Sequence, residues 1–234
     1  MIDGLIFDKD GTLFDFRSSW GRWATIFVST IASDPLHAQR LARAIGFDLG
    51  TGTFAPDSPV IAATAADIAA ALLPDLPGMT HGGLTDRIDE AAGNAPMSEA
   101  VPLAPLLAEL RAAGLKLGVA TNDSEAPARR HLNAHGITGF FDFIAGYDSG
   151  FGAKPGPGMC LAFAQHVNLD PARVAMVGDS RHDLMAGRAA GMRTIAVLTG
   201  IATAAELSPL ADVVLADIGG LPGWLDEVSP QLTA

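Results

Sequence analysis

The sequence predicts an α/β fold in which a parallel β-sheet carries helices on both faces and an all-helical segment is inserted after the first strand. Two observations lead to this prediction. From Val101 onward, short apolar stretches alternate with helical patterns, and such alternation requires right-handed crossovers between parallel strands. The segment 16–98, in contrast, shows only helical patterns. We therefore expect an α/β core formed by residues 1–15 and 99–234, and a helical domain formed by residues 16–98.

The first strand and the helical segment are predicted from apolar spacing and from chain breakers. Ile2–Phe7 is an apolar run that ends at Asp8. One helix is predicted from apolar residues that recur at helical spacing, namely Trp20, Trp23, Ile26, Phe27 and Ile31. A second helix is predicted from Asp34-Pro35 to about Ile45, followed by a loop over Gly46–Pro59. A third helix is predicted over Pro59–Leu73, where Pro74 ends it, and a weaker one over Leu84–Ala92.

The C-terminal part of the core alternates strands and helices. Gly114, Gly136 and Gly191 each follow a helical pattern, as glycine often does at helix C-termini. The predicted strands are Leu117–Ala120, Phe143–Ala145, Val174–Val177, Arg193–Val197 and Val213–Leu215. The predicted helices are Pro102–Ala113, Glu125–Ala134, Gly158–Val167 and Asp183–Ala190.

Composition excludes several classes of protein. Of the 234 residues, 49% are apolar and 18% are charged, so the chain can bury a large core and is unlike a disordered chain. The net charge of −11, without a lysine or arginine cluster, disfavours nucleic acid as a partner, because phosphate backbones demand concentrated positive charge. The single cysteine, Cys160, permits no intrachain disulfide and argues against a cysteine-based zinc site. We therefore expect a cytoplasmic location.

The sequence gives no sign of membrane attachment. The N-terminus lacks the basic and then apolar pattern of a signal peptide. The longest apolar segment, Val60–Leu73, is interrupted by Asp67 and is too short to span a bilayer. We therefore expect no membrane partner.

The run Asp8-Lys9-Asp10-Gly11-Thr12 carries the strongest chemical signal. Its two carboxylates directly follow an apolar strand, and open α/β sheets bind their ligands at the carboxyl ends of strands. Gly11 indicates that the strand ends there, so both carboxylates can face one crevice. Such a pair suits one nucleophilic or metal-binding carboxylate beside one general acid or base. The alternative interpretation is a simple turn, in which Asp and Gly are common.

Further polar residues follow three later strands. Because the carboxyl ends of parallel strands share one edge, we expect all of these side chains to meet in one crevice. The groups are Asp8 with Asp10, Thr121 with Asn122, Lys154, and Asp179 with Asp183. Carboxylates gathered in this way repel one another unless a cation is present, and a divalent metal would supply it.

Each of the later groups also has a structural interpretation. Thr121 and the residues after it can cap a helix, Lys154 can be a solvated loop lysine, and Ser180 with Asp183 can form a capping box.

On these motifs the chain resembles the haloacid dehalogenase-like superfamily, and within it the phosphoglycolate phosphatase-like branch. The resemblance rests on Asp8-Lys9-Asp10-Gly11-Thr12, on Thr121-Asn122, on Lys154-Pro155 and on Gly178-Asp179-Ser180-Arg181-His182-Asp183. It implies a Rossmann-like core whose helical cap occupies residues 16–98.

The resemblance also implies the chemistry of the carboxylates. In the family, the residue matching Asp8 attacks phosphorus and forms an aspartyl-phosphate, while Asp10 protonates the leaving oxygen and then activates water. Mg²⁺ would be bound by Asp8, the Asp10 carbonyl and Asp179, with Asp183 holding its position directly or through water.

The remaining residues would bind phosphate. By the same resemblance, Thr121 and the Asn122 backbone N–H hold the phosphoryl oxygens, and Lys154 neutralises Asp8 and the phosphoryl group together. The function implied is a Mg²⁺-dependent phosphomonoesterase for a small phosphorylated metabolite, with phosphoglycolate the favoured substrate.

Two other functions remain open at this point. A phosphosugar mutase of the same superfamily would use the same residues. A receiver-type phospho-aspartate signalling domain is the alternative from another class, although such domains are shorter and have no helical insertion. The substrate, the cap residues that select it and the oligomeric state are not predicted.

Several other residues are expected to be structural. Trp20 and Trp23 are assigned to the core of the helical domain rather than to a lid over substrate, and Cys160 is assigned to a buried helix. Three arginines are candidates for contacting a substrate carboxylate, although arginine is ordinarily exposed: Arg17, Arg22 and Arg43.

Overall fold

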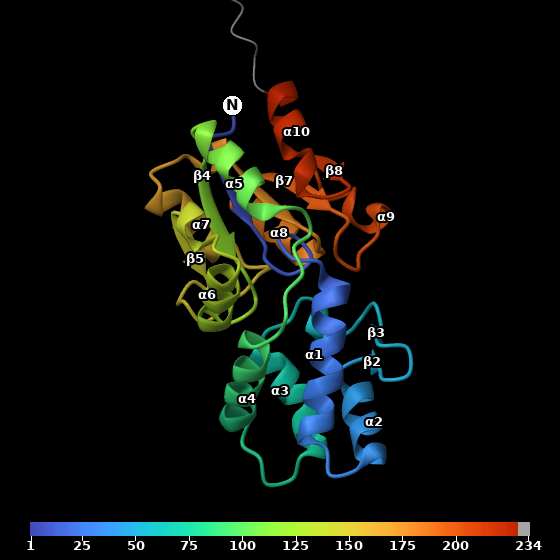
Figure 1. The fold of residues 1–234 in the computed structure, drawn as a ribbon. Coiled ribbons are helices and arrows are strands. Elements are labelled where there is room, and N and C mark those ends of the chain that lie inside the picture. The colour runs from blue at the N-terminus through green and yellow to red at the C-terminus, as the bar shows by residue number, and fades with distance from the viewer. Residues whose placement is uncertain (229–234) are drawn as a thin grey trace, which may run out of the picture.

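A computed structural model describes residues 1–228 of the chain (Figure 1). Its central feature is a six-stranded sheet with the strand order β5-β4-β1-β6-β7-β8, in which every neighbouring pair is parallel. The strands are β1 (Gly4–Phe7), β4 (Lys116–Ala120), β5 (Phe143–Ala145), β6 (Val174–Gly178), β7 (Arg193–Val197) and β8 (Val213–Leu215). The predicted parallel sheet is confirmed, and β1 lies at its centre, where the chain switches direction across the sheet.

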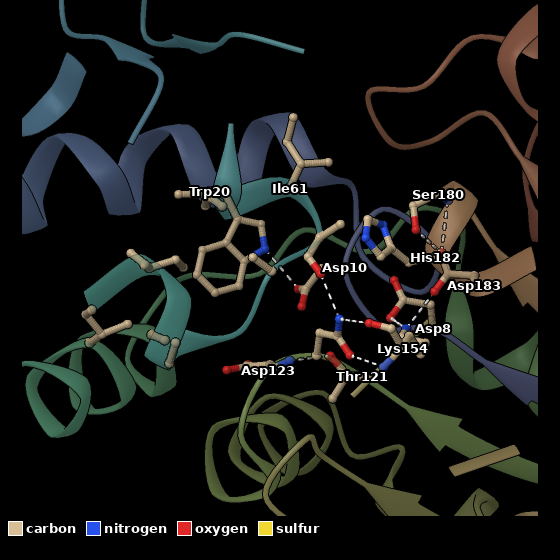
Figure 2. Close-up of a pocket in the computed structure, with 18 of the residues that line it drawn as sticks. Asp8, Asp10, Trp20, Ile61, Thr121, Asp123, Lys154, Ser180, His182 and Asp183 are labelled. Atoms are coloured by element: carbon tan, nitrogen blue, oxygen red, sulfur yellow. Dashed lines mark hydrogen bonds and ion pairs between the residues drawn. The ribbon is translucent and has the colours of Figure 1, made fainter. Parts of the chain in front are cut away.

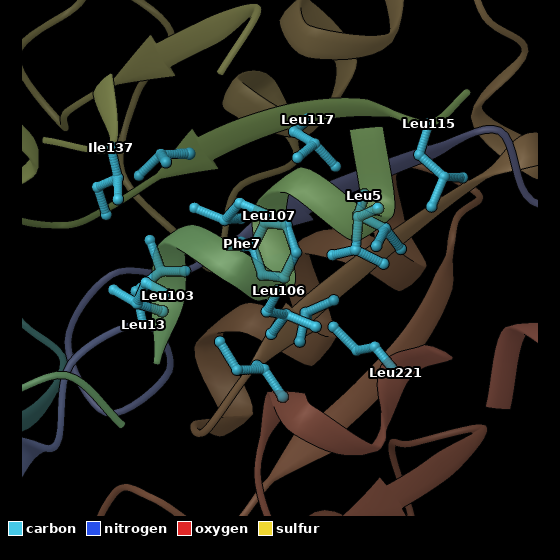
Figure 3. Packing of buried hydrophobic residues seen from close by; sticks show 14 of the residues in the cluster. Leu5, Phe7, Leu13, Leu103, Leu106, Leu107, Leu115, Leu117, Ile137 and Leu221 are labelled. Atoms are coloured by element: carbon cyan, nitrogen blue, oxygen red, sulfur yellow. The ribbon is translucent and has the colours of Figure 1, made fainter. Parts of the chain in front are cut away.

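Helices cover both faces of the sheet because successive residues of a strand point to opposite sides. In β1, Leu5 and Phe7 share a hydrophobic cluster with Leu107 and Leu221, as Figure 3 shows, whereas Ile6 belongs to a second cluster with Phe163. The helices of this part are α5 (Leu103–Ala112), α6 (Glu125–Ala134), α7 (Gly158–His166), α8 (Arg181–Ala189), α9 (Ala204–Leu207) and α10 (Leu221–Val228). Sequence analysis missed α9 and α10 because both are too short to show a clear helical period.

A second group of helices lies apart from the sheet (Figure 1). These helices are α1 (Phe16–Ile31), α2 (Pro35–Ala44), α3 (Ala65–Leu72) and α4 (His81–Gly93). They bury a hydrophobic cluster of their own, which includes Trp23, Phe27, Leu41 and Leu84. Within residues 1–228, every helix is too short or too polar to cross a lipid bilayer.

The chain enters and leaves this group through two adjacent connections. The Asp15 N–H donates to the Ser98 carbonyl at 2.8 Å, and the Ala100 N–H donates to the Leu13 carbonyl at 3.0 Å. The Asp15 side chain also accepts from the Ser18 N–H and so caps α1. The two connections therefore run side by side between the sheet and the helices.

The prediction of an all-helical segment is wrong in one place. Where a loop was expected over Gly46–Pro59, β2 (Phe47–Asp48) and β3 (Thr53–Phe54) form a two-stranded antiparallel hairpin. The Phe47 and Phe54 rings lie 4.7 Å apart and hold the two strands together. Strands of two residues are too short to produce an alternating pattern, so the glycines and prolines of this stretch indicated only a loop.

The predicted helix over Pro59–Leu73 is also wrong in its first half. Pro59–Ile61 is a single 3₁₀ turn, and α3 begins only after Thr64. Thr64 and Asp67 form a capping box, which ends the turn and starts a new helix. Val60 and Ile61 therefore lie outside α3 and do not follow its helical spacing.

The packing of α5 against the sheet gives a stability prediction. Leu107 is fully buried in the cluster of Figure 3, so Leu107→Ala is expected to lower the free energy of unfolding by about 2–5 kcal/mol. In the control Leu36→Ala, the side chain is 68% exposed and the change is expected to stay within about 0.5 kcal/mol. Urea unfolding measures both values, and equal losses would contradict the packing described here.

Candidate active site

One cavity gathers nearly all of the predicted site residues. It lies between the carboxyl ends of the central strands and the helical group, and Figure 2 shows the side chains that line it. The predicted residues that line it are Asp8, Asp10, Thr121, Asn122, Lys154 and Asp183. Asp179 is the exception, but it lies directly beside Asp8 and Asp183. Four segments that are distant in the sequence thus meet at one edge of the sheet.

Asp8, Asp179 and Asp183 form a buried carboxylate cluster. One oxygen from each lies within 4.8 Å of the other two. Burial raises the pKa of Asp8 to about 7 against the opposing effect of Lys154, and burial together with the charges of Asp183 and Asp8 raises the pKa of Asp179 well above its usual value. Such a group of ionised carboxylates is stable only with cations close to it.

The surroundings of Asp179 fit a small, hard cation. Gly11, whose φ is +85°, and Gly200 approach this carboxylate so closely that a Cβ would lie 2.4 Å and 1.7 Å from its Oδ2 atom. Asp179 forms no ion pair with any residue between 1 and 228, whereas Asp8 and Asp183 both pair with Lys154. A set of carboxylate oxygens is the donor set that Mg²⁺ and Ca²⁺ prefer, so these residues fit a divalent metal.

Lys154 is a buried cation at the centre of the cluster. Its Nζ atom lies 2.5 Å from Asp8 Oδ1 and 2.6 Å from Asp183 Oδ1, and it also donates to the Ala120 carbonyl at 2.7 Å. Burial disfavours the ammonium, but the two carboxylates outweigh burial and raise the pKa of Lys154. The alternative of a solvated loop lysine is therefore excluded.

Asn122 fixes the backbone of Lys154. Its side-chain carbonyl accepts from the Lys154 N–H at 2.9 Å, and its amide donates to the Lys154 carbonyl at 2.9 Å. The same amide donates to the Ala62 carbonyl of the helical group at 2.7 Å. The adjacent Thr121 hydroxyl lines the cavity and accepts from the Asp123 N–H at 3.0 Å. Thr121 therefore shapes the turn as well as the cavity wall.

Asp183 has two structural partners at once. The predicted capping box is present, because Asp183 Oδ2 accepts from the N–H of Ser180 at 2.9 Å and from its hydroxyl at 2.7 Å. Its other oxygen is the one that pairs with Lys154. The capping interpretation and the site interpretation are thus compatible.

A second buried lysine, which sequence analysis did not single out, organises the side of the cavity near Asp10. Lys9 is fully buried, and its Nζ atom lies 2.7 Å from both Asp10 oxygens and 3.3 Å from Asp123. Burial lowers the pKa of an ammonium, but Asp10 and Asp123 outweigh burial and raise the pKa of Lys9. The sequence offered one signal for Lys9, its position between the two carboxylates Asp8 and Asp10.

Trp20 and His131 complete the surroundings of Lys9 and Asp10. The Trp20 indole N–H donates to Asp10 Oδ1 at 2.9 Å (Figure 2). The Trp20 ring centroid also lies 5.4 Å from Lys9 Nζ. His131 Nε2 lies 2.9 Å from the Ala92 carbonyl, which can only accept, so Nδ1 is free to accept from Lys9 at 3.2 Å. Burial and Lys9 lower the pKa of His131 to about 4, so this ring stays neutral.

The structure decides the remaining expectations about single residues. Trp20 and Trp23 are buried in the helical group as predicted, but both also line the cavity. Cys160 is buried on α7, as expected. The three arginines are exposed and do not line the cavity: Arg17, Arg22 and Arg43.

The fold and the site define an α/β protein with a cavity in which buried carboxylates are paired with buried lysines. The family model described as haloacid dehalogenase-like hydrolase matches residues 2–191. The chain therefore belongs to the haloacid dehalogenase-like hydrolases, and the predicted family is confirmed.

Individual relatives agree with this assignment. The chain is 32% identical over 225 residues to "Probable phosphatase IndB" of Dickeya dadantii, covering 91% of this chain and 88% of that protein. It is 36% identical to the phosphoglycolate phosphatase of Neisseria meningitidis, but over only 53% of this chain and 54% of that protein. The crystal structure of CbbY from Rhodobacter sphaeroides in complex with phosphate matches with a TM-score of 0.72 at 23% identity, covering 94% of this chain and 96% of that one. At that identity the likeness shows the fold alone.

The buried position of Lys9 gives a prediction for this site. Lys9→Met leaves Asp10 and Asp123 without their cation, so the free energy of unfolding is expected to fall by roughly 3–5 kcal/mol. The control Lys116→Met removes a lysine whose side chain is 46% exposed and 3.7 Å from Asp142, so its loss is expected to stay below about 1 kcal/mol. Chemical denaturation compares the two variants. A Lys9→Met loss no larger than that of the control would contradict the network.

Proposed function

We propose that this protein is a Mg²⁺-dependent phosphomonoesterase that acts on a small phosphorylated metabolite through an aspartyl-phosphate on Asp8. The observation that carries the proposal is the pairing of two different carboxylates in one cavity. Asp8 lies 2.5 Å from the ammonium of Lys154, while Asp10 is held by Lys9 and Trp20 on the side of the helical group. Relatives named as phosphatases support the same reaction class.

In the first half of the reaction, an Asp8 oxygen attacks the phosphorus atom of the substrate. The bond between phosphorus and the ester oxygen breaks, and its electron pair goes to the leaving oxygen, which takes a proton from Asp10. Lys154 and the Thr121 hydroxyl, with the Asn122 N–H, neutralise and hold the phosphoryl oxygens. An alcohol and the Asp8 aspartyl-phosphate result.

In the second half, water cleaves the aspartyl-phosphate. Asp10, now ionised, takes a proton from the water molecule, whose oxygen forms the new bond to phosphorus, and the bond to Asp8 breaks. Inorganic phosphate leaves, and Asp8 returns as a carboxylate beside Lys154. The contacts of Asp10 with Lys9 and Trp20 keep its carboxyl group on one side of the cavity through both steps.

The carboxylate cluster and the Asp10 carbonyl would hold the metal. The residues are Asp8, Asp10, Asp179 and Asp183, the last directly or through water. When bound, Mg²⁺ supplies positive charge next to the phosphoryl oxygens and so offsets their repulsion from Asp8.

The helical group acts as a cap in this proposal, with residues 16–98 closing over the core of residues 1–15 and 99–234. Residues 229–234 lie outside the described part of the chain. Contacts between the two parts support the proposal, since Ser124 donates to Asp89 at 2.9 Å and Asn122 donates to the Ala62 carbonyl. Closure excludes water while the acyl phosphate forms.

Replacement of the nucleophile tests the reaction. Asp8→Asn is expected to lower phosphate release from p-nitrophenyl phosphate by about 10⁴-fold or more, and Asp10→Asn by about 10²–10⁴-fold with an alkyl phosphate. The exposed Asp86→Asn serves as the control and should keep wild-type activity. Full activity of Asp8→Asn would remove Asp8 from its role. Formation of a phosphosugar isomer without free phosphate would favour the mutase instead.

Metal binding has a readout that does not depend on activity. Mg²⁺ at about 100 times its Kd is expected to stabilise the wild-type protein by about 2.7 kcal/mol, and thermal unfolding measures this shift. Asp179→Asn should lose the shift, because it removes a ligand that has no ion pair among residues 1–228. Asp86→Asn should keep it. An unchanged shift in Asp179→Asn would show that the metal binds elsewhere.

A further inference from the structure

The wall that faces the carboxylates across the cavity is apolar. It comes from the helical group and includes Trp23, Val60, Ile61, Ile68 and Ile88. Its other members are alanines and Trp20, so within residues 1–228 the helical group contributes no charged side chain to the lining. Figure 2 shows Ile61 and Trp20 on the same side of Asp10, toward the helical group. A leaving group that departs from the phosphoryl position toward this wall meets hydrocarbon and aromatic surface.

Among residues 1–228, the lining offers no lysine or arginine that is free to pair with a substrate carboxylate. Lys154 already pairs with Asp8 and Asp183, and Lys9 does not line the cavity. In the part of the chain that the structure describes, His182 is the one other basic residue of the lining. It is exposed at the start of α8, on the core side and not on the apolar wall. All of the arginines in residues 16–98 are exposed, and none of them lines the cavity.

Electrostatics therefore disfavours a substrate with a carboxylate of its own. On the core side of the cavity, the carboxylates of Asp8, Asp10, Asp123 and Asp183 already occupy the two buried ammonium groups, those of Lys154 and Lys9. A second anionic group on the substrate would lose its hydration against the apolar wall and gain no ion pair in return. A neutral group would instead gain from burying its own apolar surface there.

We propose that the substrate is a phosphate monoester whose leaving group is an uncharged alcohol with an apolar surface, and that phosphoglycolate, with its carboxylate, is a poor substrate. This inference rests on the proposed phosphatase function and names the class of substrate for the same site. Ile61 is a specificity-determining residue in this scheme, because it is only half-buried and belongs to the turn Pro59–Ile61 that lies over the cavity.

A matched pair of substrates tests the inference. Isobutyl phosphate and 2-phosphoglycolate have nearly the same shape, but the first has a CH(CH₃)₂ group where the second has a carboxylate. The value of kcat/KM is expected to be at least about ten-fold higher for isobutyl phosphate. Equal values, or a preference for phosphoglycolate, would overturn the inference while leaving the phosphatase function intact. Release from neither compound nor from p-nitrophenyl phosphate would overturn the phosphatase function itself.

A charge placed in the wall gives a second test. Ile61→Arg is expected to raise the ratio of kcat/KM for phosphoglycolate over isobutyl phosphate by about ten-fold or more, because it supplies the missing cation. Ile61→Gln has a similar polarity without the charge and should change the ratio much less. If both variants change the ratio equally, the lack of a cation is not what excludes phosphoglycolate, and the inference fails.

Discussion

The site depends on one electrostatic arrangement, in which the ammonium of Lys154 lies between the carboxylates of Asp8 and Asp183. Asp8 follows β1, Lys154 lies in the loop after β5, and Asp183 lies in the first turn of α8. The ion pairs therefore tie together segments that the sheet only brings near one another. Without the lysine, the two carboxylates would be buried with no cation beside them. Their transfer out of water would then cost on the order of several kcal/mol each, which no ion pair would offset. Gly11 and Gly200 approach the Asp179 carboxylate so closely that no other residue fits at these two positions.

Lys9 performs the corresponding task on the other side of the cavity. It neutralises Asp10 and Asp123 and rests against the ring of Trp20, which itself donates to Asp10. Because Trp20 belongs to α1, the carboxyl group proposed as acid and base is held from the helical group as well as from the sheet. Movement of the helical group would therefore alter the surroundings of Asp10. Closure of the cap is in this way linked to the proton transfer that the proposal assigns to Asp10.

Much of this arrangement could be predicted from the sequence because it follows from parallel-strand geometry. Asp8, Thr121 and Asp183 each come soon after an apolar strand, and strand ends share one edge, so their convergence required no knowledge of side-chain packing. The network around Lys9 was not predictable in the same way. The burial of Lys9 and the contact between Trp20 and Asp10 depend on how α1 packs against the sheet. The spacing of residues along the chain does not predict that packing. The hairpin of β2 and β3 was missed because such short strands leave no periodic signal.

The central claim is that Asp8 becomes covalently phosphorylated during turnover. The most direct measurement is acid quenching of the wild-type protein within its first turnover of p-nitrophenyl phosphate in the presence of Mg²⁺, followed by mass spectrometry of the peptide that contains Asp8. The account predicts a phosphoryl group on Asp8 that disappears as free phosphate forms. A phosphoryl group on another residue, or turnover without any phosphorylated protein at times when a burst of p-nitrophenol is present, would contradict it.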